Sequence, residues 1–424
     1  MFLNVVLPVV LIVGIMLAFS FPIYLAFLAA TIYLQVFVNQ MSMLNLFTGM
    51  FEAVARNSLL AVPFFVVAGN LLATGSLGKR LVDFCAVFMK KIPGGMALTC
   101  VGANAIFGAI SGSAPAATAT FGKILWNPLR EVYGDEEAAG LITSSGSLSL
   151  IIPPSMSLIM FGIVTDTSVS QLFMAGFIPG ILCVIILATY LGIKHRKDVS
   201  NVTREPGERT AALKRGIPAL LLPIIILGGI YGGLCSPTEA GAIAALYASI
   251  VSLFVIRDIK LSQFVKIFVD SSRTVARLFI LIAVSTAFSQ ALTITQAPRA
   301  LLTLMQDISP FAYLVMINVV LFIAGMFLDP SAVNLIISPL LIPIGRALGI
   351  SPVQLGVVYA MNISIGMISP PFGLSLFVSQ MTLERPMGLI VKGALPFICC
   401  YVVALILITY IPEISLFLPR LLIS

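Results

Sequence analysis

The sequence predicts an all-α polytopic membrane protein that is built as an inverted repeat. Of the 424 residues, 59% are hydrophobic and 10% are charged, and the mean hydropathy is +1.10, far above that of a soluble domain. Uncharged runs of 31 residues (Ile92–Gly122) and 28 residues (Ala138–Thr165) are each long enough to span a bilayer. Two double prolines, Pro153-Pro154 and Pro370-Pro371, interrupt apolar runs 217 residues apart. Composition thus predicts the class, and the repeated breaks predict the architecture.

The distribution of charge predicts the orientation of the spans. The segment Lys194–Gly216 holds seven Lys or Arg residues against three acids, so the positive-inside rule makes this loop (194–216) cytoplasmic. Ser170–Ile193 then descends to the loop from outside, and Ala138–Thr165 rises from the cytoplasm, which places Lys123–Glu137 inside. The formal net charge of +7 therefore records orientation and predicts no nucleic-acid partner. The apolar run Leu3–Ser20 lacks a basic region before it, which predicts a retained span and a periplasmic N-terminus.

The run Ile92–Gly122 is predicted to be a re-entrant hairpin. Lys90, Lys91 and Lys123 bound it, so both of its ends are cytoplasmic, and a single crossing cannot begin and end on the same side. Gly, Ser and Pro in "AISGSAPAAT" (Ala109–Thr118) can break the helix at the turn. Backbone at membrane depth is tolerated where it is buried in protein or lines a wet cavity, so the tip is expected to face a site. One long kinked helix is the alternative.

The second half of the chain is expected to contain three more spans and a second hairpin. Asp329-Pro330 interrupts the apolar run after Ser309, which indicates two helical arms entering from outside. The expected spans are Ile217–Leu234, Ala242–Ile256 and Leu278–Thr295, and the expected arms are Ser309–Leu328 and Leu335–Ile344.

An internal repeat relates the two halves. A shift of 217 residues superimposes the double prolines and four further positions. Because one hairpin enters from the cytoplasm and the other from outside, the halves are expected to have opposite topology. The further matched pairs are Ser147 with Ser364, Leu172 with Leu389, Gly176 with Gly393, and Pro179 with Pro396.

The double prolines predict oxygen ligands at the centre of the membrane. Proline has no N–H, so the carbonyl four residues earlier in a helix loses its donor. The carbonyls expected to be free are those of Ser149, Leu150, Gly366 and Met367, and the nearby hydroxyls are those of Ser111, Ser113, Ser147, Ser149, Ser331 and Ser364. Such oxygen sets suit a hard cation such as Na⁺, while half-helix N-termini facing the same place favour an anion.

Proton coupling is the rival mechanism, and the titratable residues disfavour it. The one histidine, His195, lies in the predicted cytoplasmic loop, and most acids lie at span ends. Asp329 is the exception. A carboxylate within a span is a candidate for function, with helix capping before Pro330 as the alternative.

Two other polar features have structural explanations. Glu52 and Arg56, at i and i+4, are expected to form an interfacial ion pair, with a substrate clamp as the alternative. Glu239, after "SPT", is expected to begin a helix on the outer face, with partner docking as the alternative. The six cysteines show no CxxC spacing, so neither disulfides nor a metal site are predicted.

Three other classes of function remain to be compared. A stand-alone ion-coupled carrier shares the inverted repeat but needs no protein partner. A channel does not need two opposed hairpins closing one site. An intramembrane enzyme needs paired acids, a His-Glu zinc set or a nucleophile with a base, and none occurs at suitable spacing, so no catalytic residue and no cofactor are predicted.

The sequence resembles the large membrane subunit of tripartite ATP-independent periplasmic (TRAP) transporters. The resemblance runs in order along nearly the whole chain. It looks most like the sialic-acid members, with C4-dicarboxylate members second. The matching stretches are "VPFFVVAGNLLATGSL" (Val62–Leu77), "GAISGSAPAATAT" (Gly108–Thr120), "LIIPPS" (Leu150–Ser155), "QLFMAGFIPGIL" (Gln171–Leu182), "SPTEAGAIAALYA" (Ser236–Ala248) and "SPPFGLSLF" (Ser369–Phe377).

The resemblance implies a bacterial inner-membrane importer that works with a small membrane subunit and a periplasmic substrate-binding protein. It implies Na⁺ as the coupling ion, an organic acid as substrate, contact with membrane lipid, and an elevator mechanism in which a transport domain slides on a scaffold. The scaffold would be residues 1–91 and 217–298. The transport domain would be 92–193, with hairpin 92–122 and broken helix 138–165, and 309–424, with hairpin 309–345 and broken helix 353–380.

The resemblance also implies a set of site residues at the hairpin tips and broken helices. The second tip, "LDPSAVN", differs from the first, "SGSAPAA", so equal ligand sets are not expected. The implied cation ligands are Ser111, Ser113, Gly146, Ser149, Leu150, Gly325, Asp329, Gly366 and Met367. The implied substrate ligands are Ser113, Pro115, Ser147, Ser155, Ser331, Asn334, Asn362 and Ser364.

Overall fold

The computed structural model describes residues 5, 7–19, 21–197, 208–295 and 308–422, and every regular element in these ranges is a helix. Residues 198–207 of the predicted loop, parts of the predicted scaffold (1–4, 6, 20 and 296–298) and residues 423–424 lie outside the described residues. The first half contains α1 (Leu7–Ala18), α2 (Ile23–Tyr33), η2 (Leu34–Val38), α3 (Met43–Val54), η3 (Asn57–Leu60), α4 (Ala61–Thr74), α5 (Leu77–Met89), α6 (Gly95–Ser111), α7 (Ala114–Gly146), η4 (Ser147–Leu150), α8 (Met156–Thr165) and α9 (Val169–Lys194). The second half contains α10 (Glu208–Tyr231), α11 (Pro237–Ile250), η5 (Val251–Val255), α12 (Leu261–Ile294), α14 (Pro310–Phe327), α15 (Pro330–Ala347), α16 (Pro352–Gly366), α17 (Leu374–Leu383), α18 (Met387–Tyr410) and α19 (Pro412–Leu422).

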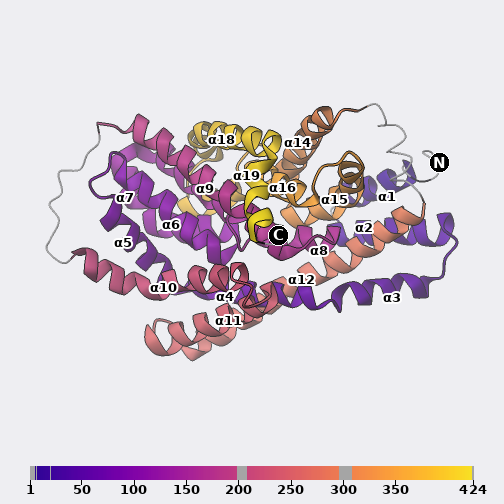
Figure 1. Cartoon of the computed structure of the whole chain (residues 1–424), viewed down its shortest axis with the longest axis horizontal. Coiled ribbons are helices and arrows are strands. Elements are labelled where there is room, and N and C mark those ends of the chain that lie inside the picture. The colour runs from indigo at the N-terminus through magenta and orange to yellow at the C-terminus, as the bar shows by residue number, and fades with distance from the viewer. Residues whose placement is uncertain (1–4, 6, 20, 198–207, 296–307, 423–424) are drawn as a thin grey trace.

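Helices α4, α11 and α12 form one packed group. Helix α4 packs on α11 and α12, and α12 also packs on α2 and α3. Figure 1 shows α3, α4, α10, α11 and α12 along one side of the molecule and α9, α14 and α18 along the opposite side. These helices belong to the segments that were expected to form the scaffold, and the division into domains stays a prediction.

Seven helices of the described residues are long and apolar enough to cross a membrane, and an eighth is counted if the bent α15 is one span. They include α9, α10, α12, α14 and α18, and the predicted multi-pass, all-α class is confirmed. Two expected spans differ in length. Helix α12 runs without interruption for 34 residues, because the polar stretch before Leu278 continues the same helix, and α1 has only 12 residues where Leu3–Ser20 was predicted to cross.

The chain reverses direction within the predicted first hairpin. Gly112 adopts φ +59° between α6 and α7, a conformation that suits glycine. The backbone N–H of Ala97 donates to Tyr133 Oη at 3.4 Å, and the rings of Phe107 and Phe121 meet at 5.2 Å. In each pair one residue precedes the turn and the other follows it, and the pair that starts farther before the turn also ends farther after it. The two arms are therefore antiparallel, and the alternative of one kinked helix is wrong. Entry into the membrane from one side stays a prediction.

The predicted end of this hairpin at Gly122 is wrong. The second arm continues to Tyr133, and the helix breaks at Gly134, which has φ +79°. The charges of Lys123 and Glu131 misled the prediction because both side chains are exposed on a helix that continues past Gly122. The opposite face carries buried Phe121, Leu125 and Leu129 at helical spacing.

The second hairpin follows the same plan. Asp329 caps α15 after a break at Leu328, and Tyr313 Oη of α14 donates to the Leu341 carbonyl of α15 at 2.6 Å. Helix α15 is followed at Gly349 by a residue with φ +77°, which matches Gly134 of the first half.

Both predicted broken helices are present. In the first half, the helix after Gly134 ends at Gly146, is followed by η4, and resumes as α8 after the double proline. In the second half, α16 and α17 flank the corresponding double proline. Both Pro-Pro bonds, 153-154 and 370-371, are cis.

The two halves meet at positions that the repeat relates to each other. Ser364 Oγ donates to the carbonyl of its counterpart Ser147 at 2.8 Å. A residue can contact its own repeat mate only close to the axis that relates the halves. A Cβ added at Gly108 would lie 2.8 Å from Ser149 Cα. The contact recurs between the residues that the repeat relates to these two, because a Cβ added at Gly366 would lie 2.7 Å from Gly325 Cα.

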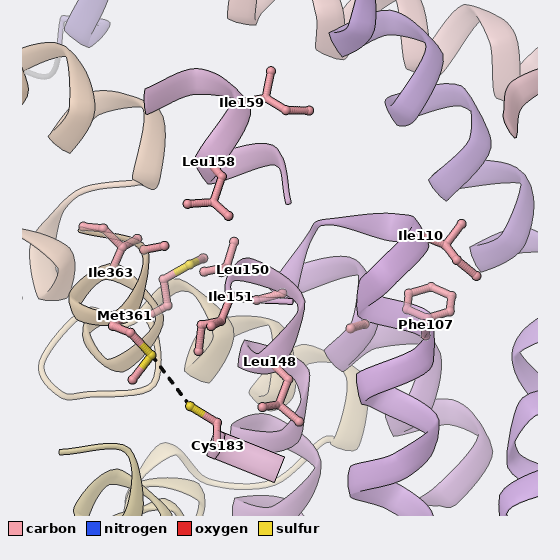
Figure 2. Packing of buried hydrophobic residues seen from close by; sticks show 14 of the residues in the cluster. Phe107, Ile110, Leu148, Leu150, Ile151, Leu158, Ile159, Cys183, Met361 and Ile363 are labelled. Atoms are coloured by element: carbon pink, nitrogen blue, oxygen red, sulfur yellow. Dashed lines mark hydrogen bonds between the residues drawn. The ribbon is translucent and has the colours of Figure 1, made fainter. Parts of the chain in front are cut away.

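The core joins both halves around this axis. Figure 2 shows Leu148 of η4 and Leu158 of α8 between Met361 and Ile363 of α16 on one side and Phe107 and Ile110 of α6 on the other. Cys183 Sγ of α9 contacts Met361 Sδ at 3.7 Å. The site is therefore supported by side chains from both repeats.

Helices α7 and α18 pack so closely that a side chain does not fit between Gly140 and Gly393. A Cβ at Gly140 would overlap the carbonyl group of Gly393, whereas Gly388 on the same α18 has open space. We expect Gly140→Ala to lower the unfolding temperature in detergent, because overpacking costs about 1–3 kcal/mol. Gly388→Ala is the control and should unfold within error of the unmodified protein. An unchanged unfolding temperature for Gly140→Ala would contradict the contact.

Candidate functional site

The two hairpin tips and the two broken helices line one cavity of about 260 Å³. Helices α4 and α12 form its remaining wall. The lining residues are Val66, Gly69, Asn70, Ser111, Gly112, Ser113, Pro115, Ala116, Leu150, Met156, Ser157, Met160, Thr274, Leu278, Asp329, Pro330, Ser331, Met367 and Leu374. The prediction that both tips face a common site is therefore supported by geometry.

Four helices begin at this cavity. Each helix N-terminus carries a partial positive charge from the aligned peptide dipoles, so their convergence favours an anion. The first residues of α7, α8, α15 and α17 that line the cavity are Pro115, Ala116, Met156, Ser157, Pro330, Ser331 and Leu374.

Asp329 carries the only charged side chain that lines the cavity among the described residues. Its Oδ1 accepts from the N–H groups of Ser331 and Ala332 at 2.9 and 3.2 Å, so it caps α15 as the alternative interpretation predicted. Tyr359 Oη donates to the adjacent Pro330 carbonyl and fixes the tip against α16. Asp329 therefore both shapes the tip and places a negative charge beside the cavity.

The expectation of bare carbonyls before the prolines is wrong at three of the four positions. Ser155 Oγ and Ser157 Oγ donate to the Leu150 carbonyl at 2.6 and 2.9 Å. The carbonyls of Gly366 and Met367 accept from the backbone N–H groups of Ser369 and Ser375 at 3.1 and 3.0 Å. Ser155, Ser157 and Ser375 follow the double prolines and Ser369 lies within the break, and together they replace the donors that proline lacks. Each carbonyl keeps a second lone pair, so cation binding there stays a prediction.

The implied ligands fall into two groups. Some line the cavity directly, and others lie behind it in the buried layer. Those in the cavity wall are Ser111, Ser113, Pro115, Leu150, Asp329, Ser331 and Met367. Those outside its lining are Gly146, Ser147, Ser149, Ser155, Gly325, Asn334, Asn362, Ser364 and Gly366, all of them buried.

The buried layer behind the first tip contains hydroxyls without partners among the described residues. Thr118 Oγ1, Ser147 Oγ and Ser149 Oγ are fully buried and accept or donate no hydrogen bond there. Gly146 lies directly against Thr118, since a Cβ at Gly146 would overlap Thr118 Oγ1. Buried polar groups are normally paired, so these oxygens are available to a ligand.

The second half has a different buried set. Asn362 Nδ2 donates to Asn318 Oδ1 at 2.7 Å, and Asn318 Nδ2 donates to Thr409 Oγ1 at 3.2 Å. Asn362 Oδ1 and Asn334 Nδ2 are buried without a partner among the described residues. The expectation of unequal ligand sets therefore agrees with the side chains that the two halves present.

The α4 and α12 wall was missed from the sequence. Val66, Gly69 and Asn70 come from α4, and Thr274 and Leu278 come from α12. Their helices are separated by about 200 residues in the chain, since Asn70 and Ser271 lie 201 positions apart. The stretch Val62–Leu77 carried part of the family resemblance, but nothing in its own pattern indicated a site.

The structure corrects the expected ion pair of Glu52 and Arg56. Helix α3 ends at Val54, so the two residues do not share a helix, and Arg56 Nη1 lies 3.7 Å from Asp166 Oδ1 instead. Arg56 lines a separate groove and not the central cavity, which removes the substrate-clamp alternative for that cavity. The expected helix start at Glu239 is confirmed, because Ser236 and Glu239 form a capping box.

The chain is similar to known proteins both in sequence and in fold. Residues 9–414 match the sequence model of the DctM component of tripartite ATP-independent periplasmic transporters. The chain is 39% identical to the C4-dicarboxylate TRAP transporter large permease protein DctM of Pseudomonas aeruginosa, covering 88% of each. It is 33% identical to the sialic acid TRAP transporter large permease protein SiaM of Vibrio cholerae, covering 86% of each. In structure it resembles the Alcanivorax borkumensis YdaH transporter, with a TM-score of 0.61 over 86% of each chain at 16% identity, which is a likeness of fold.

The charge of Asp329 can be removed without removing its cap. Asparagine caps helices about as well as aspartate, so Asp329→Asn is expected to keep the fold. It should reduce the rise in unfolding temperature that Na⁺ gives relative to K⁺, because a bound cation stabilises only the protein that binds it. The measurement is thermal unfolding of purified protein in matched chloride salts. A Na⁺-dependent shift equal to that of the unmodified protein would contradict a cation role for Asp329.

Proposed function

Because the chain belongs to the family of the DctM component of tripartite ATP-independent periplasmic transporters, we propose that it imports an organic acid by Na⁺ coupling and an elevator movement. The observation that supports this proposal is the single cavity lined by both hairpin tips, both broken helices and a separate wall from α4 and α12. A site at the midplane between repeats is the arrangement expected of an alternating-access carrier.

Sodium coupling rests on the unpartnered buried oxygens. A buried polar atom without a hydrogen bond costs about 1–3 kcal/mol, and a bound cation relieves that cost. Thr118 and Ser149 supply such oxygens behind the first tip, and Asn362 supplies one in the second half. Hydroxyl and amide oxygens are hard ligands, which suit Na⁺ and not a soft metal.

Anion binding rests on the helix N-termini together with the bound cations. No Lys or Arg lines the cavity among the described residues, so a carboxylate would be held by helix dipoles, hydroxyls such as Ser113, and Na⁺. This arrangement couples the two ligands, because the anion is bound weakly until the cations offset the charge of Asp329.

The substrate is proposed to be a C4-dicarboxylate, with sialic acid as the second candidate. The relative from Pseudomonas aeruginosa supports the first and the relative from Vibrio cholerae the second. The sequence resemblance alone favoured sialic acid, but the higher identity belongs to the C4-dicarboxylate relative.

The transport domain of the proposed mechanism is the part of the chain that carries the tips, namely 92–193 and 309–424. The scaffold is 1–91 and 217–298. Gly69 of α4 lies at the sliding surface, since a Cβ there would be 3.0 Å from Ser111 Cα on the first tip. Backbone contact without side chains lets one surface move past the other.

Two protein partners complete the proposal. The tripartite family name implies two further components, which we propose are a small membrane subunit and a periplasmic binding protein that delivers the acid. The complex would lie in the bacterial inner membrane, with the N-terminus of this chain periplasmic.

Uptake by the reconstituted complex tests the coupling. Proteoliposomes with both partners should accumulate labelled succinate, or sialic acid if that is the substrate, when an inward Na⁺ gradient is applied at equal pH. The binding protein should be required, which separates this mechanism from a stand-alone carrier. Equal uptake driven by a proton gradient without Na⁺ would overturn the proposed coupling.

A single hydroxyl tests the cation site. Ser149→Ala should raise the Na⁺ concentration for half-maximal uptake about 10- to 100-fold, since contacts to charged groups contribute roughly 1.5–3 kcal/mol. Ser285→Ala is the matched control, because Ser285 Oγ is also buried without a partner among the described residues but lies on α12, which belongs to neither a hairpin nor a broken helix. Parallel Na⁺ titrations should differ between the two variants, and identical curves would remove Ser149 from the site.

A further inference from the structure

The wall that α4 and α12 contribute to the cavity contains one polar side chain that can still donate a hydrogen bond into it. Val66, Gly69 and Leu278 present no polar side-chain atom. The Thr274 hydroxyl donates its one hydrogen to the Asp270 carbonyl at 3.1 Å. Asn70 is the fifth member of this wall, and its amide has two N–H donors and an oxygen with two acceptor positions.

A buried serine on the neighbouring helix holds the Asn70 amide in place. Asn70 Nδ2 donates to Ser271 Oγ at 2.9 Å, and Ser271 is 0% exposed. This bond uses one of the two amide N–H groups. It leaves the second N–H and Oδ1 of a half-buried side chain at the cavity, in an orientation that Ser271 selects.

The neighbouring glycine brings this amide close to the first tip. A Cβ at Gly69 would lie 3.0 Å from Ser111 Cα and 3.2 Å from the Ser111 carbonyl oxygen, so α4 touches the tip through backbone. Asn70 and the tip residues Ser111 and Ser113 line the same cavity, and the residue beside Asn70 is in contact with Ser111. A small acid bound at the tip lies within reach of the amide.

We propose that Asn70, oriented by Ser271, is a specificity-determining substrate contact. Its amide hydrogen-bonds an uncharged polar group of the substrate, such as a hydroxyl, that lies next to a carboxylate of the same molecule. An amide can donate and accept at once, so it can pair with both the hydrogen and the oxygen of a hydroxyl, whereas a carboxylate only accepts and leaves Asn70 Oδ1 without a donor. The inference rests on the proposed function and names a feature of its substrate.

The position of Asn70 has a second consequence. Asn70 belongs to the proposed scaffold, while the tips belong to the proposed transport domain. When the transport domain moves, the substrate moves away from Asn70. The contact therefore exists on one side of the membrane only, and it raises the affinity for a hydroxylated acid on that side relative to the other.

The test compares malate with succinate, two acids that differ by one hydroxyl. Uptake is measured with the full reconstituted complex in Na⁺. For malate, Asn70→Ala should raise KM about 3- to 10-fold, the effect of one neutral hydrogen bond, with kcat changed less. The KM for succinate should change less than about twofold. Counterflow from the opposite face should show no malate-specific change.

Ser271 supplies the positioning control. Ser271→Ala should give a smaller, malate-selective rise in KM, and Ser271→Thr, which keeps the hydroxyl, should restore the unmodified value. Ser272→Ala removes a neighbouring hydroxyl that donates to the Phe268 carbonyl, and it should leave both acids unaffected. Na⁺-dependent thermal stabilisation of every variant verifies that the cation sites are intact.

Three results would overturn the inference. These are equal changes for malate and succinate in Asn70→Ala, no change for either acid, or the same malate-specific change on both faces of the membrane. The proposed function fails separately. If the unmodified complex takes up no acid in Na⁺, that function is wrong and the inference is wrong with it.

Discussion

Backbone polar groups inside a membrane must find partners within the protein. At two places the double prolines leave backbone carbonyls without the N–H donors that a helix would supply. Each pair removes two N–H donors in the middle of an apolar segment. The structure satisfies the exposed carbonyls from beyond the break, where Ser155 and Ser157 reach back to Leu150 and the Ser375 N–H reaches back to Met367. The chain turns sharply at each break, and the N-terminus of the helix that follows lies at the cavity.

The same turns concentrate electrostatic groups at one point. Helices α8 and α17 begin just after the breaks, and α7 and α15 begin at the hairpin tips, so four positive helix ends meet in a space of about 260 Å³. Asp329 opposes them with the single carboxylate of the lining among the described residues. This balance of charge is the basis of the proposed coupling between an anion and the cations that accompany it.

Symmetry organises the site without making its halves equal. Ser147 and Ser364 meet across the axis, and the contact of Gly108 with Ser149 recurs as the contact of Gly325 with Gly366. At this recurring position one half has a serine and the other a glycine. The backbone arrangement is repeated, while the hydroxyl is present on one side only, so the two halves offer chemically different side chains at this position.

The sequence by itself determined the membrane class, the repeat, both breaks and the reversal in the first hairpin. These features depend on local properties, namely hydropathy, the missing N–H of proline and the conformational freedom of Gly112. The end of the first hairpin was missed because charges on one face of a helix resemble a loop until the buried face of Phe121, Leu125 and Leu129 is seen. Only the tertiary structure showed that Leu150 and Met367 have partners and that Asn70 meets Ser271 at the cavity. Such contacts join segments distant in the chain, and packing of whole helices decides them.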